Sequence, residues 1–340
     1  MCARPAREAG PCAARTIRAR DEKGTALSTT DVTTEEVDGM ATTTAVVDAP
    51  SSDSSPSFAE LGVRPEIVTA LAERGITHTF AIQELTLPLA LAGSDLIGQA
   101  RTGMGKTYGF GVPLLHRIAT GEATRTLDGT PRALIIVPTR ELCVQVTQDL
   151  KIAATGLTAP AASGSGTRPL KVLAIYGGTP YEQQTEALEK GVDVVVGTPG
   201  RLLDLANQSK LVLGKVEALV LDEADEMLDL GFLPDIEKLL RMVPEKRQTM
   251  LFSTTMPGPI ITLARTFLTK PTHIRAEAAD SGATHENTTQ YVYRAHSLDK
   301  PEVVSRILQA EGRGATMIFC GTKRTAQKLA DDLAERGFRV

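Results

Sequence analysis

The chain has 340 residues, of which 42% are hydrophobic and 4% aromatic, and it contains no tryptophan. Its 37 basic and 41 acidic residues give a net charge of −4, so any nucleic-acid binding needs a locally basic surface rather than bulk positive charge. No apolar run is long enough to span a bilayer, and the four cysteines show no zinc-ligand spacing. An integral membrane protein and a disulfide scaffold are excluded, and a reducing, cytoplasmic setting is the default expectation.

Residues 1–56 are rich in Thr, Ser, Ala, Asp and Pro and contain few large apolar side chains. Such a composition does not bury enough apolar surface to offset the entropy of ordering, so we predict a disordered N-terminal tail. The arginine-rich first twenty residues faintly suggest an organelle transit peptide. The alternative to a transit peptide is that translation begins at Met40, so that the residues before it are not part of the protein.

From Phe58 onward, short runs of Val, Ile and Leu alternate with helical segments, a pattern typical of a parallel sheet covered on both faces. Helices are expected at 65–74 and 83–91, ahead of the first strand. The expected strands are 95–98, 133–137, 171–175, 192–196, 218–221 and 248–253. Residues 154–169, rich in small side chains, are expected to form a loop. The pattern predicts a doubly wound α/β domain over residues 57–278.

A polar stretch at 279–289 is expected to be a linker, and a second pattern follows it over 290–340. Strands are expected at 290–294 and 316–320, and helices at 301–309 and 325–336. A unit of this size with two or three strands does not easily bury both faces of a parallel sheet, so we expect this domain to be incomplete.

The strongest motif lies directly after the first expected strand of the sheet, where a glycine-rich turn leads into a helix. Such a turn points its backbone N–H groups at phosphate oxygens, although a chance glycine turn is the alternative for the motif alone. Lys106 would reach the β- and γ-phosphates of a nucleotide, and Thr107 would bind Mg²⁺. The segment consists of Ala100, Arg101, Thr102, Gly103, Met104, Gly105, Lys106 and Thr107, with alanine where the general pattern has its first glycine.

Two acidic residues, Asp222 and Glu223, directly follow the apolar run 218–221. A carboxylate at the carboxyl end of a buried strand lies beside the phosphate loop in sheets of this type. Asp222 is therefore placed to hold Mg²⁺, and Glu223 to orient or deprotonate the attacking water. Without the phosphate loop, a solvated acidic loop would be the simpler interpretation.

These motifs together resemble the DEAD-box ATP-dependent RNA helicases of helicase superfamily 2, from Phe58 to the end of the chain. The matching segments occur in the family's order. They are Gln83 with Phe58, the phosphate loop, Pro138-Thr-Arg-Glu-Leu142, Gly177-Gly178, Thr198-Pro-Gly-Arg201, Asp222-Glu-Ala-Asp225, Ser253-Thr-Thr255 and Met317-Ile-Phe-Cys-Gly-Thr-Lys323. The resemblance implies a RecA-like domain that binds ATP with Mg²⁺, followed by an incomplete second RecA-like domain.

The resemblance also implies roles for individual residues. Gln83 and Phe58 match the family's adenine-recognition element, and a glutamine amide has the donor and acceptor that adenine's edge requires. The loops that follow three strands are implied to hold RNA through sugar and phosphate, independently of sequence. They contain Pro138, Thr139, Arg140, Gly177, Gly178, Thr198, Pro199, Gly200 and Arg201.

Two departures from the family pattern affect these expectations. Ser253-Thr254-Thr255 replaces the usual Ser-Ala-Thr but keeps both outer hydroxyls, so Ser253 and Thr255 are still expected to couple the ATP site to RNA through Asp225. We expect Thr254 to have a modest effect at most. Residues 79–82 replace a segment that normally carries two prolines.

The family's second domain normally supplies a late His-Arg-x-Gly-Arg-x-x-Arg motif, and nothing in 290–340 matches it. The expected function is an ATP-dependent RNA helicase, with RNA-stimulated ATP hydrolysis coupled to local duplex unwinding or removal of bound proteins. A chain without these arginines is expected to hydrolyse ATP weakly or not at all. The alternatives are a truncated ATP- and RNA-binding half without unwinding activity, or a DNA helicase of the same superfamily. The particular RNA, the protein partners and the oligomeric state are not encoded in recognisable motifs.

Overall fold

The computed structural model describes residues 31–37, 40–47, 55–120, 129–160, 166–278, 289, 291–296, 298–312 and 314–339. The chain divides into two compact units, Met1–Ser281 and Gly282–Val340. The first unit contains the phosphate loop and all the strands of the described residues.

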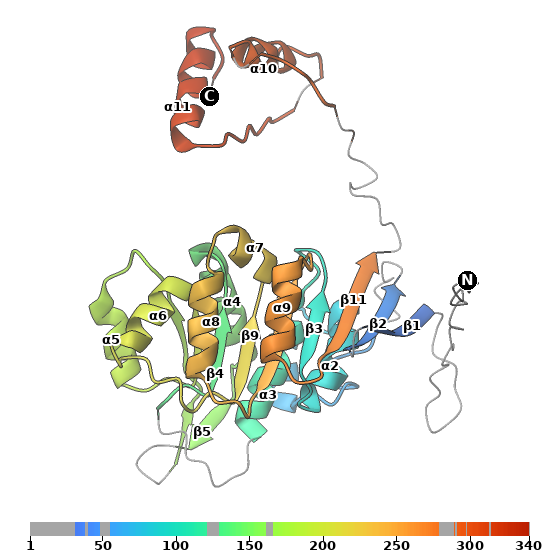
Figure 1. The fold of residues 1–340 in the computed structure, drawn as a ribbon, viewed down its shortest axis with the longest axis vertical. Helices are drawn as coiled ribbons and strands as arrows, with labels where there is room; N and C mark the ends of the chain where they lie inside the picture. Colours follow the sequence, from blue (N-terminus) through green and yellow to red (C-terminus); the bar gives the residue numbers. More distant parts are fainter. Residues whose placement is uncertain are drawn as a thin grey trace, which may run out of the picture. The chain divides into compact units, whose positions relative to one another are not determined.

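The first unit is built on a sheet with the strand order β1-β2-β11-β3-β10-β9-β4-β8-β7 (Figure 1). Every neighbouring pair from β11 to β7 is parallel, which confirms the predicted parallel α/β sheet. A separate antiparallel pair, β5 with β6, lies within residues 154–169, where we expected only a loop. The strands of the long sheet are Asp31–Val37 (β1), Met40–Val47 (β2), Leu96–Gln99 (β3), Ala133–Ile136 (β4), Val172–Ile175 (β7), Val194–Gly197 (β8), Ala218–Leu221 (β9), Gln248–Ser253 (β10) and Thr272–Ala278 (β11), and those of the pair are Thr158–Pro160 (β5) and Thr167–Pro169 (β6).

Helices cover both faces of this sheet because its central strands are apolar on both sides. Alternate residues of β10 show the division: Met250 and Phe252 pack on one face, and Leu251 packs on the other. The first face is covered by Pro65–Ala72 (α1), Ala81–Leu91 (α2), Lys106–Thr120 (α3) and Arg140–Ala153 (α4). The remaining helices of this unit are Tyr181–Glu189 (α5), Pro199–Asn207 (α6), Ala224–Asp229 (α7), Leu233–Met242 (α8) and Gly258–Phe267 (α9).

The described residues of the second unit form two helices, Lys300–Leu308 (α10) and Lys323–Glu335 (α11), close to the predicted ranges. The strands expected at 290–294 and 316–320 are wrong where the structure describes these residues, because 291–294 and 316–320 pair with no other strand. Val292, Met317 and Phe319 are largely exposed to solvent. A strand that is apolar on both faces needs neighbouring strands and helices to cover it, and the described part of this unit supplies none.

The predicted disordered tail is wrong for residues 31–37 and 40–47, which form the hairpin strands β1 and β2. Both strands are rich in threonine and valine, residues that favour extended backbone. Asp38-Gly39 separates them in the sequence, a pair typical of short hairpins. β2 pairs in parallel with β11, a strand that the apolar-run pattern missed. The rest of the predicted tail up to residue 54 lies outside the described residues.

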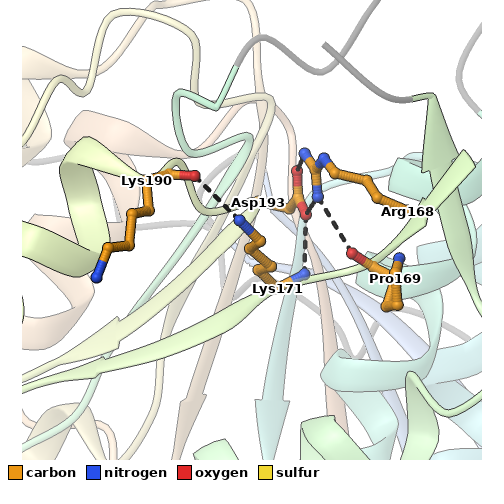
Figure 2. Close-up of polar contacts among 5 residues, drawn as sticks. All are labelled: Arg168, Pro169, Lys171, Lys190 and Asp193. Atoms are coloured by element: carbon orange, nitrogen blue, oxygen red, sulfur yellow. Dashed lines mark hydrogen bonds and ion pairs between the residues drawn. The ribbon is translucent and has the colours of Figure 1, made fainter. Parts of the chain in front are cut away.

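A buried ion pair fixes the β5–β6 pair to the sheet (Figure 2). Asp193, just before β8, is fully buried and accepts two hydrogen bonds from the guanidinium of Arg168, at 2.6 and 2.7 Å. Its second oxygen also accepts the backbone N–H of Lys171 at 2.9 Å. The carboxylate therefore exchanges its water for three donors, which is the condition for burying a charge without a large penalty.

Removing the arginine should leave the Asp193 charge buried and only partly compensated. We expect Arg168→Met to lower the free energy of unfolding by about 3 kcal/mol, measured by urea denaturation. Arg241→Met, which breaks an exposed pair with Glu237 on α8, is the matched control and should change it by less than about 0.5 kcal/mol. Equal effects of the two variants would show that the Arg168 pair contributes no more than a surface contact.

Candidate ATP and RNA site

The phosphate loop connects the carboxyl end of β3 to the first residue of α3, Lys106. Gly103 and Gly105 have backbone φ angles of +86° and +75°, which residues other than glycine rarely adopt. Gly105 is further restricted because an added Cβ would lie 2.6 Å from atoms of Gln83 and Phe80. The loop starts in register with β10, since the Ala100 N–H donates to the Ser253 carbonyl at 3.2 Å.

The Lys106 ammonium is the most informative group of the site. Lys106 is only 6% exposed, and its Nζ is buried without a hydrogen-bond partner. A buried cation is costly unless it is compensated. At the start of α3, beside the glycine-rich turn, the Lys106 ammonium has no anionic hydrogen-bond partner, so an anion bound there would compensate its charge.

Asp222 lies at the carboxyl end of β9 and is 2% exposed. Burial raises the pKa of this carboxyl to about 7, although the Lys106 charge opposes the rise. Its Oδ1 accepts the Glu223 N–H at 3.0 Å. Glu223 has φ of +52° and ψ of +52°, a left-handed conformation in a residue other than glycine, which costs free energy and is frequent at functional sites. The side chains of Asp222 and Glu223 thus follow the same strand end that the sequence indicated.

The residues present fit a magnesium ion that arrives with a nucleotide. In the described part of the chain, no group of three or more His, Cys, Asp or Glu residues is placed to hold a metal alone. The hydroxyl of Thr107 and the carboxylate of Asp222 offer the hard oxygen ligands that Mg²⁺ prefers, and phosphate oxygens would supply others. A cation near Asp222 would also favour its ionised form.

The two residues expected to recognise adenine, Gln83 and Phe58, contact other parts of the protein in this structure. Gln83, 1% exposed, accepts the Phe80 N–H at 3.0 Å and donates to the Gly105 carbonyl at 2.7 Å. Both ends of its amide are therefore used by the start of α2 and by the phosphate loop. Phe58 is 1% exposed and packs in the core, so it presents no free ring face to a ligand.

Asp225 is the last residue of the acidic motif Asp222-Glu-Ala-Asp225, and it contacts the loop that follows β10. Its carboxylate accepts the N–H and the hydroxyl of Thr255, both at 2.8 Å. Its own N–H donates to the Ser253 hydroxyl at 3.1 Å. Burial would raise the pKa of Asp225, but hydrogen bonds from Ser253, Thr255 and Thr254 outweigh it and lower the pKa. The structure thus brings together the three residues for which the sequence suggested coupling.

The candidate RNA-binding loops follow β4, β7 and β8, three neighbouring strands of the sheet. The Arg140 guanidinium lies over the Tyr176 ring, 5.6 Å from its centre. An added Cβ at Gly178 would lie 2.8 Å from this guanidinium, so the glycine allows the close approach. Thr139 caps α4 by accepting the Leu142 N–H at 3.3 Å. Arg140 and Gly178, far apart in sequence, therefore form one surface.

Arg201 is held in a similar way. Its guanidinium lies 3.9 Å from the centre of the Tyr181 ring and donates to the Thr179 carbonyl at 3.2 Å. The Tyr181 hydroxyl in turn donates to Asp204. Stacking on an aromatic ring restricts an arginine while leaving other N–H groups able to donate. No motif marked Tyr176 or Tyr181, because their contacts with Arg140 and Arg201 join segments that are separate in the sequence.

The Asp225 contacts predict different effects at two adjacent threonines. Thr255→Val removes a hydroxyl bonded to a carboxylate and should lower the free energy of unfolding by about 1 kcal/mol. Thr254→Ala should change it by less than about 0.5 kcal/mol, because the Thr254 contacts with Asp225 and Gln99 use its backbone. Urea denaturation of both variants measures the difference. Equal losses would contradict the placement of the Thr255 hydroxyl against Asp225.

Known proteins resemble this chain in sequence and in fold. The family model described as DEAD/DEAH box helicase matches residues 80–263. The chain is 42% identical over 282 residues to the ATP-dependent RNA helicase CshA of Listeria monocytogenes, covering 83% of this chain and 50% of that protein. It is 39% identical to the DEAD-box ATP-dependent RNA helicase 9, mitochondrial, of Arabidopsis thaliana, covering 82% of this chain and 44% of that protein.

Among solved structures, a DEAD box protein from Methanococcus jannaschii is similar with a TM-score of 0.57 and 33% identity, covering 83% of this chain and 71% of that one. The chain spans about half the length of the curated relatives it matches. None of its described helices is long and apolar enough to cross a membrane. The family match over 184 of 340 residues, from 80 to 263, and the similar structures show that the chain belongs to the DEAD/DEAH box helicase family.

Proposed function

We propose that this chain is the ATP- and RNA-binding part of an RNA-dependent ATPase that separates short duplexes or displaces proteins from RNA. The observation that carries the proposal is the buried Lys106 ammonium, which has no hydrogen-bond partner and lies at the start of a helix after a glycine-rich turn. A polyanion such as the phosphates of ATP would compensate this charge, and helix N-termini favour anions. We also propose that the protein acts in the cytoplasm.

In this proposal each residue of the ATP site has a distinct role. The backbone N–H groups of 101–107 surround the phosphates, and Lys106 contacts the β- and γ-phosphates. Thr107 and Asp222 would hold Mg²⁺, which would neutralise charge on the phosphates. Glu223 orients the attacking water and accepts its proton. Gln83 reads adenine, for which it exchanges its contacts with Phe80 and Gly105.

The RNA surface is proposed to lie over the loops after β4, β7 and β8, with Arg140 and Arg201 as its charged donors. The hydroxyls of Thr139 and Thr198 and the backbone N–H of Gly177 would supply contacts that do not depend on base sequence. The tyrosines beneath both arginines support this assignment, because they fix guanidinium groups that would otherwise be mobile in solvent.

RNA-stimulated hydrolysis belongs to the whole helicase, and the present chain spans about half of its relatives. A chain of these 340 residues is proposed to bind ATP with Mg²⁺ and to turn it over weakly, because residues 290–340 contain no arginine motif of the family type. An arginine of that kind typically contributes about 10³ to 10⁵ in rate. ATP and RNA binding without unwinding is therefore the activity proposed for this chain by itself.

Lys106→Met tests the ATP site. Loss of the ammonium should weaken ATP·Mg²⁺ binding at least about a hundredfold, because a charge-assisted contact of about 3 kcal/mol is removed from a buried position. Titration calorimetry measures the affinity. Lys151→Met on the exposed side of α4 is the matched control and should bind like the unmodified chain. Tight ATP·Mg²⁺ binding by Lys106→Met would contradict the proposed ATP site. Strong RNA-stimulated ATP turnover by the unmodified chain would contradict the proposed weak hydrolysis.

Arg201→Gln tests the RNA surface. It should weaken binding of single-stranded RNA about three- to tenfold and lower the salt dependence of the affinity by about one phosphate contact. Fluorescence polarisation at several salt concentrations measures both quantities, with single-stranded DNA as competitor to separate an RNA from a DNA helicase. Arg241→Gln on α8 should leave RNA affinity unchanged. Equal weakening by both variants would show that only general charge is involved.

A further inference from the structure

Gln99 lies between the phosphate loop and residues 253–255, which lie at the end of β10 and directly after it. It is the last residue of β3, in register with Ser253 of β10 on one side and Arg275 of β11 on the other. Its Nε2 donates to the Thr254 carbonyl at 3.1 Å, and its Oε1 lies 3.1 Å from Nε2 of His273. One side chain thus joins β11, the base of the phosphate loop and residue 254.

The chemistry of the partners fixes the direction of this chain of hydrogen bonds. The Thr254 carbonyl only accepts, so the NH₂ group of the Gln99 amide faces it. The Gln99 carbonyl oxygen then faces His273, which must donate from Nε2. Burial, with a smaller effect of Arg275, lowers the pKa of His273 and favours the neutral ring. A neutral imidazole carries one N–H, and this contact assigns it to Nε2.

The Thr254 carbonyl belongs to the loop that holds Asp225. The same loop is fixed on its other side, where the N–H groups of Thr254 and Thr255 donate to the Asp225 carboxylate at 3.4 and 2.8 Å. The loop therefore lies between the acidic motif and the phosphate-loop strand, with Gln99 as its side-chain contact to that strand.

We propose that Gln99 and His273 are positioning residues that hold loop 253–255 against the base of the phosphate loop, with His273 acting through Gln99. The inference rests on the proposed function only in treating this loop as the element that couples ATP to RNA. Neither residue lies in the motifs that marked the site in the sequence. Two polar side chains joined in line give a specific position, whereas apolar side chains of similar volume would provide packing alone.

Three variants separate positioning from packing. Gln99→Met keeps the length of the side chain and removes both hydrogen bonds. His273→Leu removes the donor, and His273→Gln restores an N–H donor at a similar reach. Gln148→Met on an exposed position of α4 is the matched control. The double variant Gln99→Met/His273→Leu tests whether the histidine acts through the glutamine.

Amide hydrogen exchange, followed by NMR without nucleotide, measures how strongly the backbone N–H groups of residues 253–255 are protected. We expect the Thr254 and Thr255 amides to exchange about two- to tenfold faster in Gln99→Met and in His273→Leu, the factor typical of one lost hydrogen bond. His273→Gln and Gln148→Met should exchange like the unmodified chain, and the double variant like Gln99→Met alone. Unchanged exchange in Gln99→Met would overturn the proposal. Additive effects in the double variant, or an equal change at core amides of β4, would overturn it too.

A second measurement adds ATP with Mg²⁺ to the same samples. We expect added protection of Thr254 and Thr255 in the unmodified chain and at least a threefold smaller gain in Gln99→Met, with ATP affinity changed less than threefold. An equal gain in both chains would overturn the positioning role. A lack of ATP binding by the unmodified chain would instead contradict the proposed function, while the exchange result without nucleotide would still decide the role of Gln99.

Discussion

The parallel pairing of β3, β10 and β9 is the constraint on which the site depends. Leu251 of β10 pairs with Ile97 of β3 on one side and with Leu221 of β9 on the other. Because the three strands are in step, their carboxyl ends lie along one edge of the sheet. The phosphate loop, the acidic motif and the Ser-Thr-Thr loop each follow one of these ends, so the register of three buried strands brings together residues more than 100 positions apart.

The site carries features that a protein selected only for stability would avoid. Lys106 is buried without a hydrogen-bond partner, Asp222 is buried with a raised pKa, and Glu223 adopts a left-handed backbone. Each of these costs free energy in the free protein. They occur together at one strand edge, while the apolar strands and the Arg168–Asp193 pair hold the surrounding domain. Such local violations within an otherwise consistent fold are typical of functional sites.

Continuous apolar runs predicted the central sheet well, because buried parallel strands have a strong local signal. The bounds of β9 and β10 agree with the predicted ranges, and the other central strands differ from theirs by one or two residues at one or both ends. β11 and the β1–β2 hairpin were missed because their residues are polar or alternate, and their pairing involves distant segments. The strands expected at 290–294 and 316–320 have the right composition, but no partner strand is present among the described residues.

Motifs also marked the candidate site residues, since a glycine-rich turn and a pair of acids after strands are visible in sequence. Contacts made only in three dimensions were not visible. The stacking of Arg201 on Tyr181 joins α6 to α5, and the link from His273 through Gln99 to Thr254 joins β11, β3 and the loop after β10. The core position of Phe58 and the contacts of Gln83 with Phe80 and Gly105 likewise depend on tertiary packing rather than on local pattern.

The most direct test of the account is to map the ATP·Mg²⁺ site residue by residue. NMR chemical-shift changes on titration with a non-hydrolysable ATP analogue and Mg²⁺ would report it. We expect the amides of 101–107, of Asp222 to Asp225 and of Thr254 and Thr255 to shift together with one affinity. Shifts confined to other parts of the domain, or no shifts at the phosphate loop, would contradict the central claim that ATP binds at the carboxyl ends of β3, β9 and β10.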